Sequence, residues 1–373
     1  MTDLRRRFVE QMRRDGAPLT PELAAVFAKV PREAFVADGF QRRDGSWATP
    51  GAADFLDVVY RDDVLVTKVD GAVPVSSSSQ PSLMAIMLAA LDVRPGARVL
   101  EIGAGTGYNA ALLSMLGADV TSIDVQPDVA DRARAGLDRA GVHNVRVLVA
   151  DGYAGVPAEP FDRVIVTVGV AGVSPHWLGP PPPSGPGPAG DALVVVPVEH
   201  AGTHPVLAVR GSATGPVTAS VICPSGFMSA AGPLTARHPR SHPCPPPGVL
   251  GDFVPVAPPR WREPLDTLGY RDLWYAAGVW DTRATHAALS GHNGGILVLL
   301  DETGAGGAAI LPDGSIAAGG AAARRYAAAA ADVIDLWEAA DRPPMQSWRI
   351  ALDLAGDPEF PIWCPATWTL APP

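Results

Sequence analysis

Several features that mark common protein classes are scarce in this sequence of 373 residues. Only three cysteines occur, Cys223, Cys244 and Cys364, and no two of them form a CxxC pair. An odd number of widely spaced cysteines supports neither a disulfide framework nor a cysteine zinc site, so a reduced, cytoplasmic setting is the expectation. No apolar run approaches about 18 residues, so we expect neither a membrane span nor a signal peptide.

Positive charge is also scarce. Lysine occurs only at Lys29 and Lys68, and 29 basic residues stand against 39 acidic ones, which gives a formal net charge of −10. Such an acidic protein is a poor candidate for general binding to nucleic acid or to an anionic membrane. Hydrophobic residues make up 47% of the chain, which excludes wholesale disorder, and the length favours two domains. The 39 glycines and 39 prolines predict long loops within the folded structure.

The sequence pattern divides the chain into four expected regions. Residues 1–75 contain amphipathic helical patterns and a loop next to the candidate site, and residues 76–235 form the core. Residues 236–260 are rich in proline and are expected to be a linker. Residues 261–373 form a small additional α+β domain, a candidate for recognising a peptide substrate. Another proline-rich stretch, 179–190, is expected to be an exposed loop within the core.

The core carries the pattern that decides the fold class. Short apolar segments alternate with helical ones, and we expect strands at 98–102, 119–124, 145–150, 161–168 and 192–198. This alternation predicts an α/β fold with a mostly parallel sheet covered on both faces. The C-terminal region has strand candidates at 295–300, 307–311 and 347–354 and an alanine-rich helix at about 320–340.

A glycine-rich turn follows the first core strand. It reads Gly103-Ala104-Gly105-Thr106-Gly107-Tyr108, a GxGxG spacing between strand and helix, where a ligand can approach the backbone closely. The dinucleotide fingerprint is GxGxxG, and Tyr108 occupies the place of its third glycine, which argues against NAD or FAD. The phosphate-binding GxxxxGK pattern is absent from the sequence as well.

Three carboxylates mark the ends of successive core strands: Glu101, Asp124 and Asp151. Open α/β sheets bind ligands at this edge, where Asp124 is placed to accept ribose hydroxyls and Asp151 to reach an adenine amino group. Each carboxylate alone would be an ordinary solvated strand end. Together they suit a nucleoside that carries positive charge and no phosphate, as S-adenosylmethionine does.

These residues resemble a known family. The series VLEIGAGTGY, SIDV, ADGY and FDRVIV resembles class I S-adenosylmethionine-dependent methyltransferases, which implies a Rossmann-like fold, here with N-terminal helices and the additional C-terminal domain. The segments VPREAFV, Tyr60-Arg61-Asp62, Ser79-Gln80-Pro81 and VICPSGFM resemble the protein L-isoaspartyl O-methyltransferases. The resemblance covers roughly residues 20–232 and implies a carboxyl O-methyltransferase that produces S-adenosylhomocysteine.

The resemblance also implies roles for individual residues. The cofactor would contact residues in the glycine turn and at the strand ends: Glu101, Gly103, Ala104, Gly105, Thr106, Gly107, Tyr108, Asp124, Val125, Asp151 and Gly152. The substrate would contact the loop before the next helix and the YxD segment: Ser78, Ser79, Gln80, Tyr60 and Asp62. Ser79, with Ser78 beside it, would orient the reacting carboxylate and is the candidate catalytic group. A carboxylate is ionised at neutral pH, so positioning rather than a general base would drive the reaction.

The sequence departs from that family in the serine run Ser76-Ser77-Ser78-Ser79, in the proline-rich insertion and in the C-terminal extension. These departures resemble an extended subgroup associated with lanthipeptides, graspetides and lasso peptides. That resemblance implies methylation of an aspartate in a modified ribosomal precursor peptide, after which the ester closes to an aspartimide and can hydrolyse to isoaspartate. The alternatives are a generic isoaspartyl repair enzyme and a non-catalytic peptide-binding protein on the same scaffold.

Other residue groups have simpler interpretations. His238, His242 and Cys244 have metal-like spacing but no fourth ligand nearby, so we expect no metal site. We expect His286 and His292 in a surface loop and the C-terminal tryptophans mainly in a core. The arginines at 5, 6, 7, 13 and 14 are expected on a solvated helix face, and contact with an acidic peptide is the alternative. The sequence leaves the oligomeric state open.

Overall fold

A computed structural model describes residues 2–157, 159–179, 192–212, 215–235, 249–250, 253–289, 291–292, 295–302, 304 and 306–371. Most of both proline-rich stretches lie outside these residues, as do the possible metal ligands His238, His242 and Cys244. Within the described residues, no helix combines the length and apolar character needed to cross a membrane. No three metal-ligating side chains gather there either.

The N-terminal region combines helices with a small sheet. Its helices are α1 (Thr2–Arg14), α2 (Pro21–Lys29) and α3 (Phe55–Val59), with a short 3-10 turn at Arg32–Phe35. The sheet has the order β2-β1-β3-β4, formed by β1 (Phe40–Gln41), β2 (Trp47–Ala48), β3 (Leu65–Asp70) and β4 (Val73–Ser78). The Thr20 hydroxyl accepts a hydrogen bond from the Leu23 amide at 3.2 Å, and Pro21 fits the first turn, so these two residues fix the start of α2.

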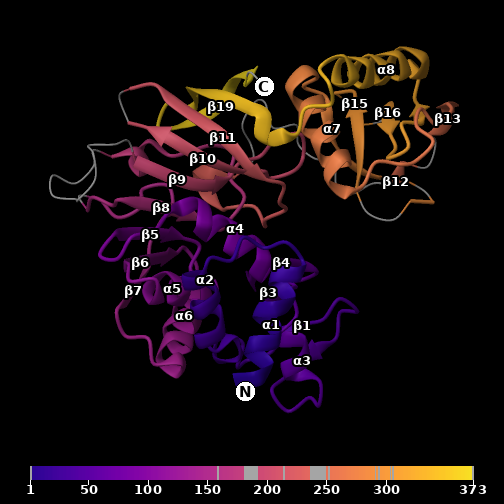
Figure 1. Ribbon diagram of the computed structural model, residues 1–373. Coiled ribbons are helices and arrows are strands. Elements are labelled where there is room, and N and C mark those ends of the chain that lie inside the picture. Colours follow the sequence, from indigo (N-terminus) through magenta and orange to yellow (C-terminus); the bar gives the residue numbers. More distant parts are fainter. Residues whose placement is uncertain are drawn as a thin grey trace.

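A nine-stranded sheet forms the centre of the molecule, in the order β19-β18-β11-β10-β9-β8-β5-β6-β7 (Figure 1). Its parallel part comprises β5 (Arg98–Ile102), β6 (Asp119–Asp124), β7 (Val145–Val149), β8 (Arg163–Val166) and β9 (Ala192–Pro197). The antiparallel part comprises β10 (Val206–Gly211), β11 (Val217–Cys223), β18 (Trp348–Asp357) and β19 (Phe360–Leu370). The expected α/β class, with five parallel core strands, is confirmed.

Alternation along the strands assigns residues to two hydrophobic clusters. Val99 belongs with the apolar residues of α1, α2, α4 (Pro81–Leu91), α5 (Tyr108–Met115) and α6 (Pro127–Ala140). Leu100 and Ile102 belong to the other cluster, which continues into the C-terminal region. The two faces of the central sheet are therefore buried against different parts of the chain, because successive side chains point to opposite faces.

The C-terminal region has its own sheet, in the order β12-β14-β15-β16-β17-β13. Its strands are β12 (Val249–Leu250), β13 (Val254–Ala257), β14 (Ala284–Leu289), β15 (Ile296–Leu300), β16 (Gly307–Ile310) and β17 (Ile316–Gly319). Helices α7 (Thr267–Trp280) and α8 (Ala323–Ala339) accompany this sheet (Figure 1). Short 3-10 turns lie at Pro175–Leu178, Gly232–Leu234 and Met345–Ser347.

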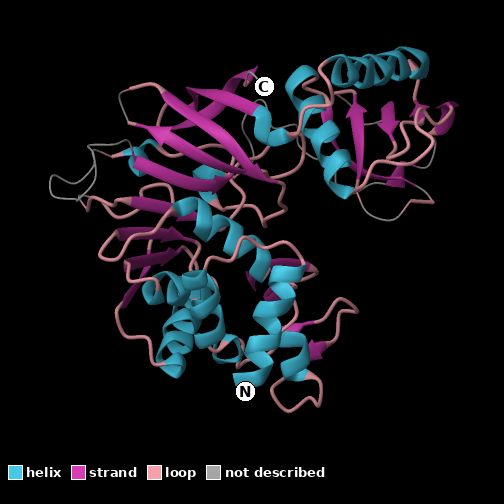
Figure 2. Cartoon of the chain, in the orientation of Figure 1, coloured by secondary structure: helices cyan, strands magenta, loops and turns pink. Residues whose placement is uncertain are grey.

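The last two strands differ from the expected domain division. β18 pairs with β11 and β19 with β18, so both extend the central sheet, whose upper part in Figure 2 is made mostly of strands. The region expected as a separate α+β domain, 261–373, therefore contributes strands to the core, and the division into domains stays a prediction. Trp274, Trp337 and Trp348 are buried in the shared cluster, as expected for core tryptophans.

The two histidines expected in a surface loop differ from each other. His286 belongs to β14 and is half-buried, and a Cβ on Gly202 of the core would lie 2.7 Å from its Nδ1. His292 is exposed. The prediction was therefore wrong for His286, because its strand is covered by the 199–204 turn.

Candidate active site

The glycine turn joins β5 to α5 at the carboxyl edge of the parallel strands. Gly103 has a φ of 94°, and a Cβ there would lie 2.7 Å from the Thr167 hydroxyl oxygen. Gly105 has a φ of 52°, and a Cβ there would lie 3.1 Å from the carbonyl oxygen of Ser77. Side chains at either position would be strained and crowded, so glycine is required on both grounds. The approach of Ser77 also brings the serine run against this turn.

Asp124, the last residue of β6, ties this turn to the next helix. Its Oδ2 accepts a hydrogen bond from the Gly105 amide at 3.1 Å, and its Oδ1 accepts one from the Gln126 amide at 3.0 Å. Burial raises the pKa of Asp124, while these two hydrogen bonds act in the opposite direction. Each carboxylate oxygen has lone pairs left for a further donor. Val125 beside it is 53% exposed, so the edge is open at this point.

Glu101 does not lie at the open edge. It is 1% exposed and accepts hydrogen bonds from Asn109 Nδ2 at 2.7 Å and from the Ser122 hydroxyl at 2.5 Å. The reason is strand alternation: Glu101 shares the face of Val99 and points toward α5. The expectation of direct cofactor contact at Glu101 therefore does not fit its position, and its carboxyl group instead links β5, β6 and α5. Burial raises its pKa to about 7.

Replacing Glu101 with glutamine is expected to change how stability depends on pH. The pKa is about 7 in the folded chain against 4.5 for an unperturbed glutamate, so the folded state holds the proton longer. The free energy of unfolding of the parent should therefore fall as pH rises from about 4.5 to about 7. Glu101→Gln lacks this loss and keeps a partner for Asn109 and for Ser122.

Denaturant titrations at pH 4 and pH 8 would measure the effect. The variant should gain about 3 kcal/mol relative to the parent between these pH values. The exposed Glu263→Gln is the matched control and should follow the parent. Parallel pH profiles for Glu101→Gln and the parent would contradict the assignment.

Asp151 follows β7 and is exposed, as a residue that reaches a ligand should be. It accepts a hydrogen bond from the Tyr153 amide at 2.9 Å, which shapes the turn through Gly152. The Tyr153 hydroxyl donates to the Pro361 carbonyl at 3.0 Å, and its ring contacts Phe360 at 5.5 Å between centroids. The start of β19 thus borders the expected adenine end of the site, which the sequence pattern did not indicate.

The hairpin of β3 and β4 carries the serine run to the glycine turn. Lys68 donates to Gln126 Oε1 at 2.8 Å and to Asp128 at 2.7 Å, at the beginning of α6. Gln126 in turn donates to the Val75 carbonyl at 3.1 Å. These bonds fasten the hairpin beside Asp124, so the candidate catalytic and cofactor residues share one edge of the sheet.

The two candidate catalytic serines differ in their surroundings. Ser78 is 2% exposed, and its hydroxyl has no hydrogen-bond partner within the described part of the chain. Ser79 is half-buried, just before α4. A buried hydroxyl without a partner is costly, which fits a group reserved for a ligand. Their assigned roles remain predictions.

Arg32 of the VPREAFV segment organises this loop, and the sequence interpretation gave it no role. It is fully buried, and its two terminal nitrogens donate to backbone carbonyls at 2.8–3.5 Å, those of Val59, Arg61, Asp63, Ser78 and Ser79. One guanidinium therefore joins the YxD segment to the serine run. Its place in the VPREAFV segment, one of those that carry the family resemblance, was the sequence signal that could have indicated this role.

The expected substrate residues divide into two groups. Asp62 accepts hydrogen bonds from the Ser82 amide at 2.7 Å and from Gln80 Nε2 at 3.0 Å, so it fixes the beginning of α4 next to Ser79. Tyr60 is 4% exposed and bonds to Glu33 and Arg5 instead. Gln80 and Asp62 are exposed enough to contact a substrate directly. The buried Tyr60 instead supports the loop through its hydrogen bonds to Glu33 and Arg5.

Tyr108 also differs from its expected place. Its ring is 1% exposed and packs against Phe35 at 5.4 Å and Phe27 at 6.4 Å between centroids, with the Arg32 guanidinium 5.8 Å from its centre. As the first residue of α5 it points back into the N-terminal helices, so only its backbone faces the glycine turn. Thr106 is buried as well, at 6% exposure.

Comparisons with known proteins place this site in a family. The profile of the family described as protein-L-isoaspartate(D-aspartate) O-methyltransferase matches residues 3–218, more than half of the chain. A protein-L-isoaspartate O-methyltransferase of Thermotoga maritima is 37% identical over 164 residues, 43% of this chain and 47% of that protein. One of Methanoculleus marisnigri is 40% identical over 144 residues, 38% of this chain and 56% of that protein. The chain thus spans about half the length of these curated relatives.

A solved structure titled protein-L-isoaspartate O-methyltransferase has a TM-score of 0.53 and 23% sequence identity. The alignment covers 96% of this chain and 99% of the other, so the likeness of fold extends through the C-terminal region. The glycine turn and the strand-end carboxylates agree with the match to the family profile. The chain belongs to the protein-L-isoaspartate(D-aspartate) O-methyltransferase family, because the family profile matches more than half of it.

Proposed function

We propose that the chain is an S-adenosylmethionine-dependent carboxyl O-methyltransferase that methylates isoaspartyl residues of polypeptides. One observation carries the proposal: the serine run lies against the glycine turn, with the Ser77 carbonyl beside Gly105. A nucleophile held by the serines would then face a cofactor held by the turn. Family membership and the names of the relatives support this substrate.

The carboxylates at the edge of the sheet suit the hydroxyl, amino and sulfonium groups of S-adenosylmethionine. Asp124 offers carboxylate oxygens for the ribose hydroxyls, and the exposed Asp151 lies where an adenine amino group is expected. When bound, the cofactor supplies an electrophilic methyl group on a sulfonium. The residues of this chain then have to hold a substrate carboxylate in line with that methyl group, and they need to remove no proton. S-adenosylhomocysteine and a methyl ester are the products.

Replacing Ser79 with alanine is expected to lower kcat by about 10–100-fold, because an unpositioned carboxylate loses alignment with the methyl group. Affinity for S-adenosylmethionine should stay unchanged, since Asp124 and the glycine turn are untouched. Steady-state kinetics and calorimetry would separate the two effects. Ser77→Ala is the matched control, because its side chain has no assigned role, and it should behave as the parent. Equal turnover of Ser79→Ala and the parent would remove the role given to Ser79.

Methylation of a normal aspartate in a modified ribosomal precursor peptide is the second candidate. The serine run supports it, because this run replaces the usual family sequence in the loop next to the reacting carboxylate. The C-terminal extension no longer distinguishes the two candidates, since a solved structure with the isoaspartyl name aligns over nearly the whole chain. Under this second function, the methyl ester would close to an aspartimide. The partner would be a precursor peptide, and the setting a reduced cytoplasm.

A direct test compares a short isoaspartyl peptide with its normal-aspartate twin. Each is incubated with S-adenosylmethionine, and mass spectrometry measures addition of one methyl group. Labelling of the isoaspartyl peptide alone is the expected result, and labelling of the aspartyl peptide alone would favour the second candidate. Failure to bind S-adenosylmethionine at all would contradict both and favour a non-catalytic peptide-binding protein.

A further inference from the structure

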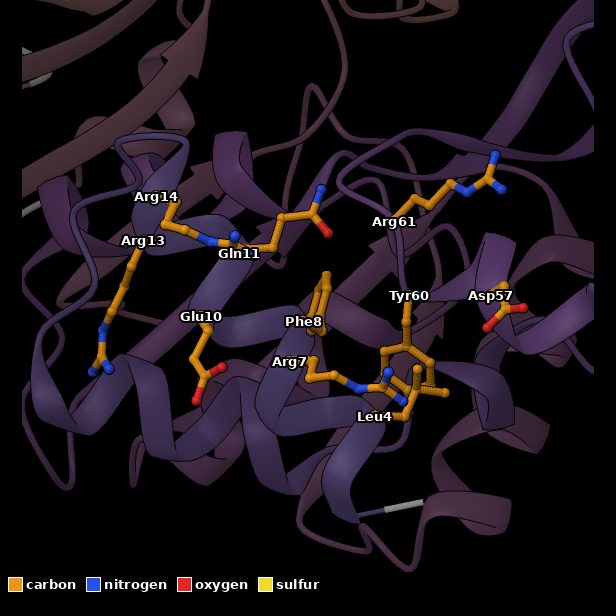
Figure 3. A pocket seen from close by; sticks show the side chains of 10 residues that line it. All are labelled: Leu4, Arg7, Phe8, Glu10, Gln11, Arg13, Arg14, Asp57, Tyr60 and Arg61. Atoms are coloured by element: carbon orange, nitrogen blue, oxygen red, sulfur yellow. The ribbon is translucent and has the colours of Figure 1, made fainter.

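An open pocket of about 890 Å³ lies between α1 and the segment that follows α3 (Figure 3). Phe8 and Tyr60 are among its lining residues, although both are nearly fully buried. Four arginines line it, Arg7, Arg13 and Arg14 from α1 and Arg61 from the YxD segment, against only two carboxylates. This lining is therefore net positive in a chain whose formal charge is −10. We call this feature the arginine groove.

The arginines of the groove are largely uncompensated. In the part of the chain that the structure describes, Arg13, Arg14 and Arg61 form no ion pair within 4.0 Å, and Arg7 approaches only Asp3, at 3.8 Å. All four are exposed. Arg5, on the same helix but outside the groove, is paired with Glu33 at 2.8 Å. Guanidinium groups that are exposed and unpaired remain available for carboxylates of another molecule.

The segment that lines one side of the groove is hydrogen-bonded, through Arg32, to the candidate catalytic loop. The carbonyl of Arg61 accepts a hydrogen bond from Arg32 at 3.0 Å, and Arg32 donates to the Ser79 carbonyl at 3.0 Å. Asp62, the next residue, holds the Ser82 amide. The Tyr60-Arg61-Asp62 segment thus borders both features, and the occupant of the groove would be the part of the polypeptide that extends along this segment from a reacting residue at Ser79.

We propose that the arginine groove binds acidic side chains that flank the reacting residue in the polypeptide substrate. The proposal rests on the proposed function and adds a sequence preference to it. Each contact is exposed and contributes little alone, so the preference comes from several arginines acting together. Salt screens such contacts, so the preference should weaken as ionic strength rises.

Two labelled isoaspartyl peptides test the proposal. One carries aspartate and glutamate within a few residues of the isoaspartyl residue, and the other has asparagine and glutamine in their places. Fluorescence anisotropy with S-adenosylhomocysteine present measures the affinity for each peptide, independently of turnover. The parent should bind the acidic peptide about tenfold more tightly at low ionic strength, and this ratio should fall toward one at high ionic strength.

The triple variant Arg13→Gln, Arg14→Gln, Arg61→Gln should bind the two peptides equally. The control variant Arg94→Gln, Arg324→Gln, Arg325→Gln removes the same charge from exposed positions elsewhere and should keep the preference. Equal binding of both peptides by the parent, or a preference that survives in the groove variant, would overturn the proposal. Methylation is measured separately: a salt-sensitive preference without methylation would sustain the groove while contradicting the proposed function.

Discussion

Replacement of Arg32 with methionine is expected to destabilise the fold strongly and to remove methyltransferase activity. The side chain is fully buried and supplies the donors for carbonyls in two separate segments, at residues 59–63 and at Ser78-Ser79. Methionine has similar length but no donor, so these acceptors would be left buried without partners. Burial lowers the pKa of Arg32 to about 10, so the guanidinium is still charged at neutral pH. The substitution therefore removes a buried charge as well as the hydrogen-bond donors.

The free energy of unfolding should fall by about 3–5 kcal/mol, which denaturant titration would measure. Arg32→Lys is the graded variant: one ammonium can reach some of the carbonyls but not both groups at once, so an intermediate loss is expected. The exposed Arg94→Met is the matched control and should change stability by less than about 0.5 kcal/mol. A loss of that small size in Arg32→Met would refute the organising role.

Arg32 shows where prediction from the sequence stops. Pattern and spacing locate the glycine turn and the strand-end carboxylates, because strand, turn and helix follow one another within about ten residues. The role of Arg32 depends on carbonyls 27 to 47 residues away in the chain. No local sequence pattern indicates that Arg32 contacts these distant carbonyl groups.

The side chains of Glu101 and Tyr108 show a related limit, and their contact with the cofactor stays a prediction. Both lie beside the ligand-binding edge in the sequence, and the family resemblance assigned them to the cofactor. Strand alternation places Glu101 on the α5 face, and the start of α5 turns Tyr108 toward Phe35. Proximity in the sequence to a binding turn therefore does not decide which way a side chain points.

The C-terminal region shows the same limit at the level of topology. The sequence indicated three of its strands, at 295–300, 307–311 and 347–354, but the pattern does not reveal which sheet a strand joins. β18 has alternating burial along much of its length and fits the edge beside β11, and β19 then carries Pro361 to Tyr153. Long-range pairing thus brings the end of the chain next to the expected adenine site.

Replacement of Asp124 with asparagine is expected to weaken S-adenosylmethionine binding by about 100-fold, the effect of losing charged hydrogen bonds to two ribose hydroxyls. Asparagine keeps one oxygen for the Gly105 or Gln126 amide, so the turn should survive, and thermal unfolding would check this. Isothermal titration calorimetry measures the affinity. Asp119→Asn is the matched control, because it makes the same change at the opposite end of β6, where no ligand is expected.

The pH dependence gives a second, independent readout of the same carboxylate. Burial raises the pKa of Asp124, so its protonation begins at a higher pH than for an exposed aspartate. Affinity of the parent for S-adenosylmethionine should therefore be full above that pKa and decline as pH falls through it, since a protonated carboxyl accepts fewer hydrogen bonds. Asp124→Asn has no such proton to gain and should bind weakly across the same range. If the variant bound as tightly as the parent, or if both lost affinity in parallel on acidification, Asp124 would not be the ribose ligand, and the cofactor would have to be held elsewhere along the edge.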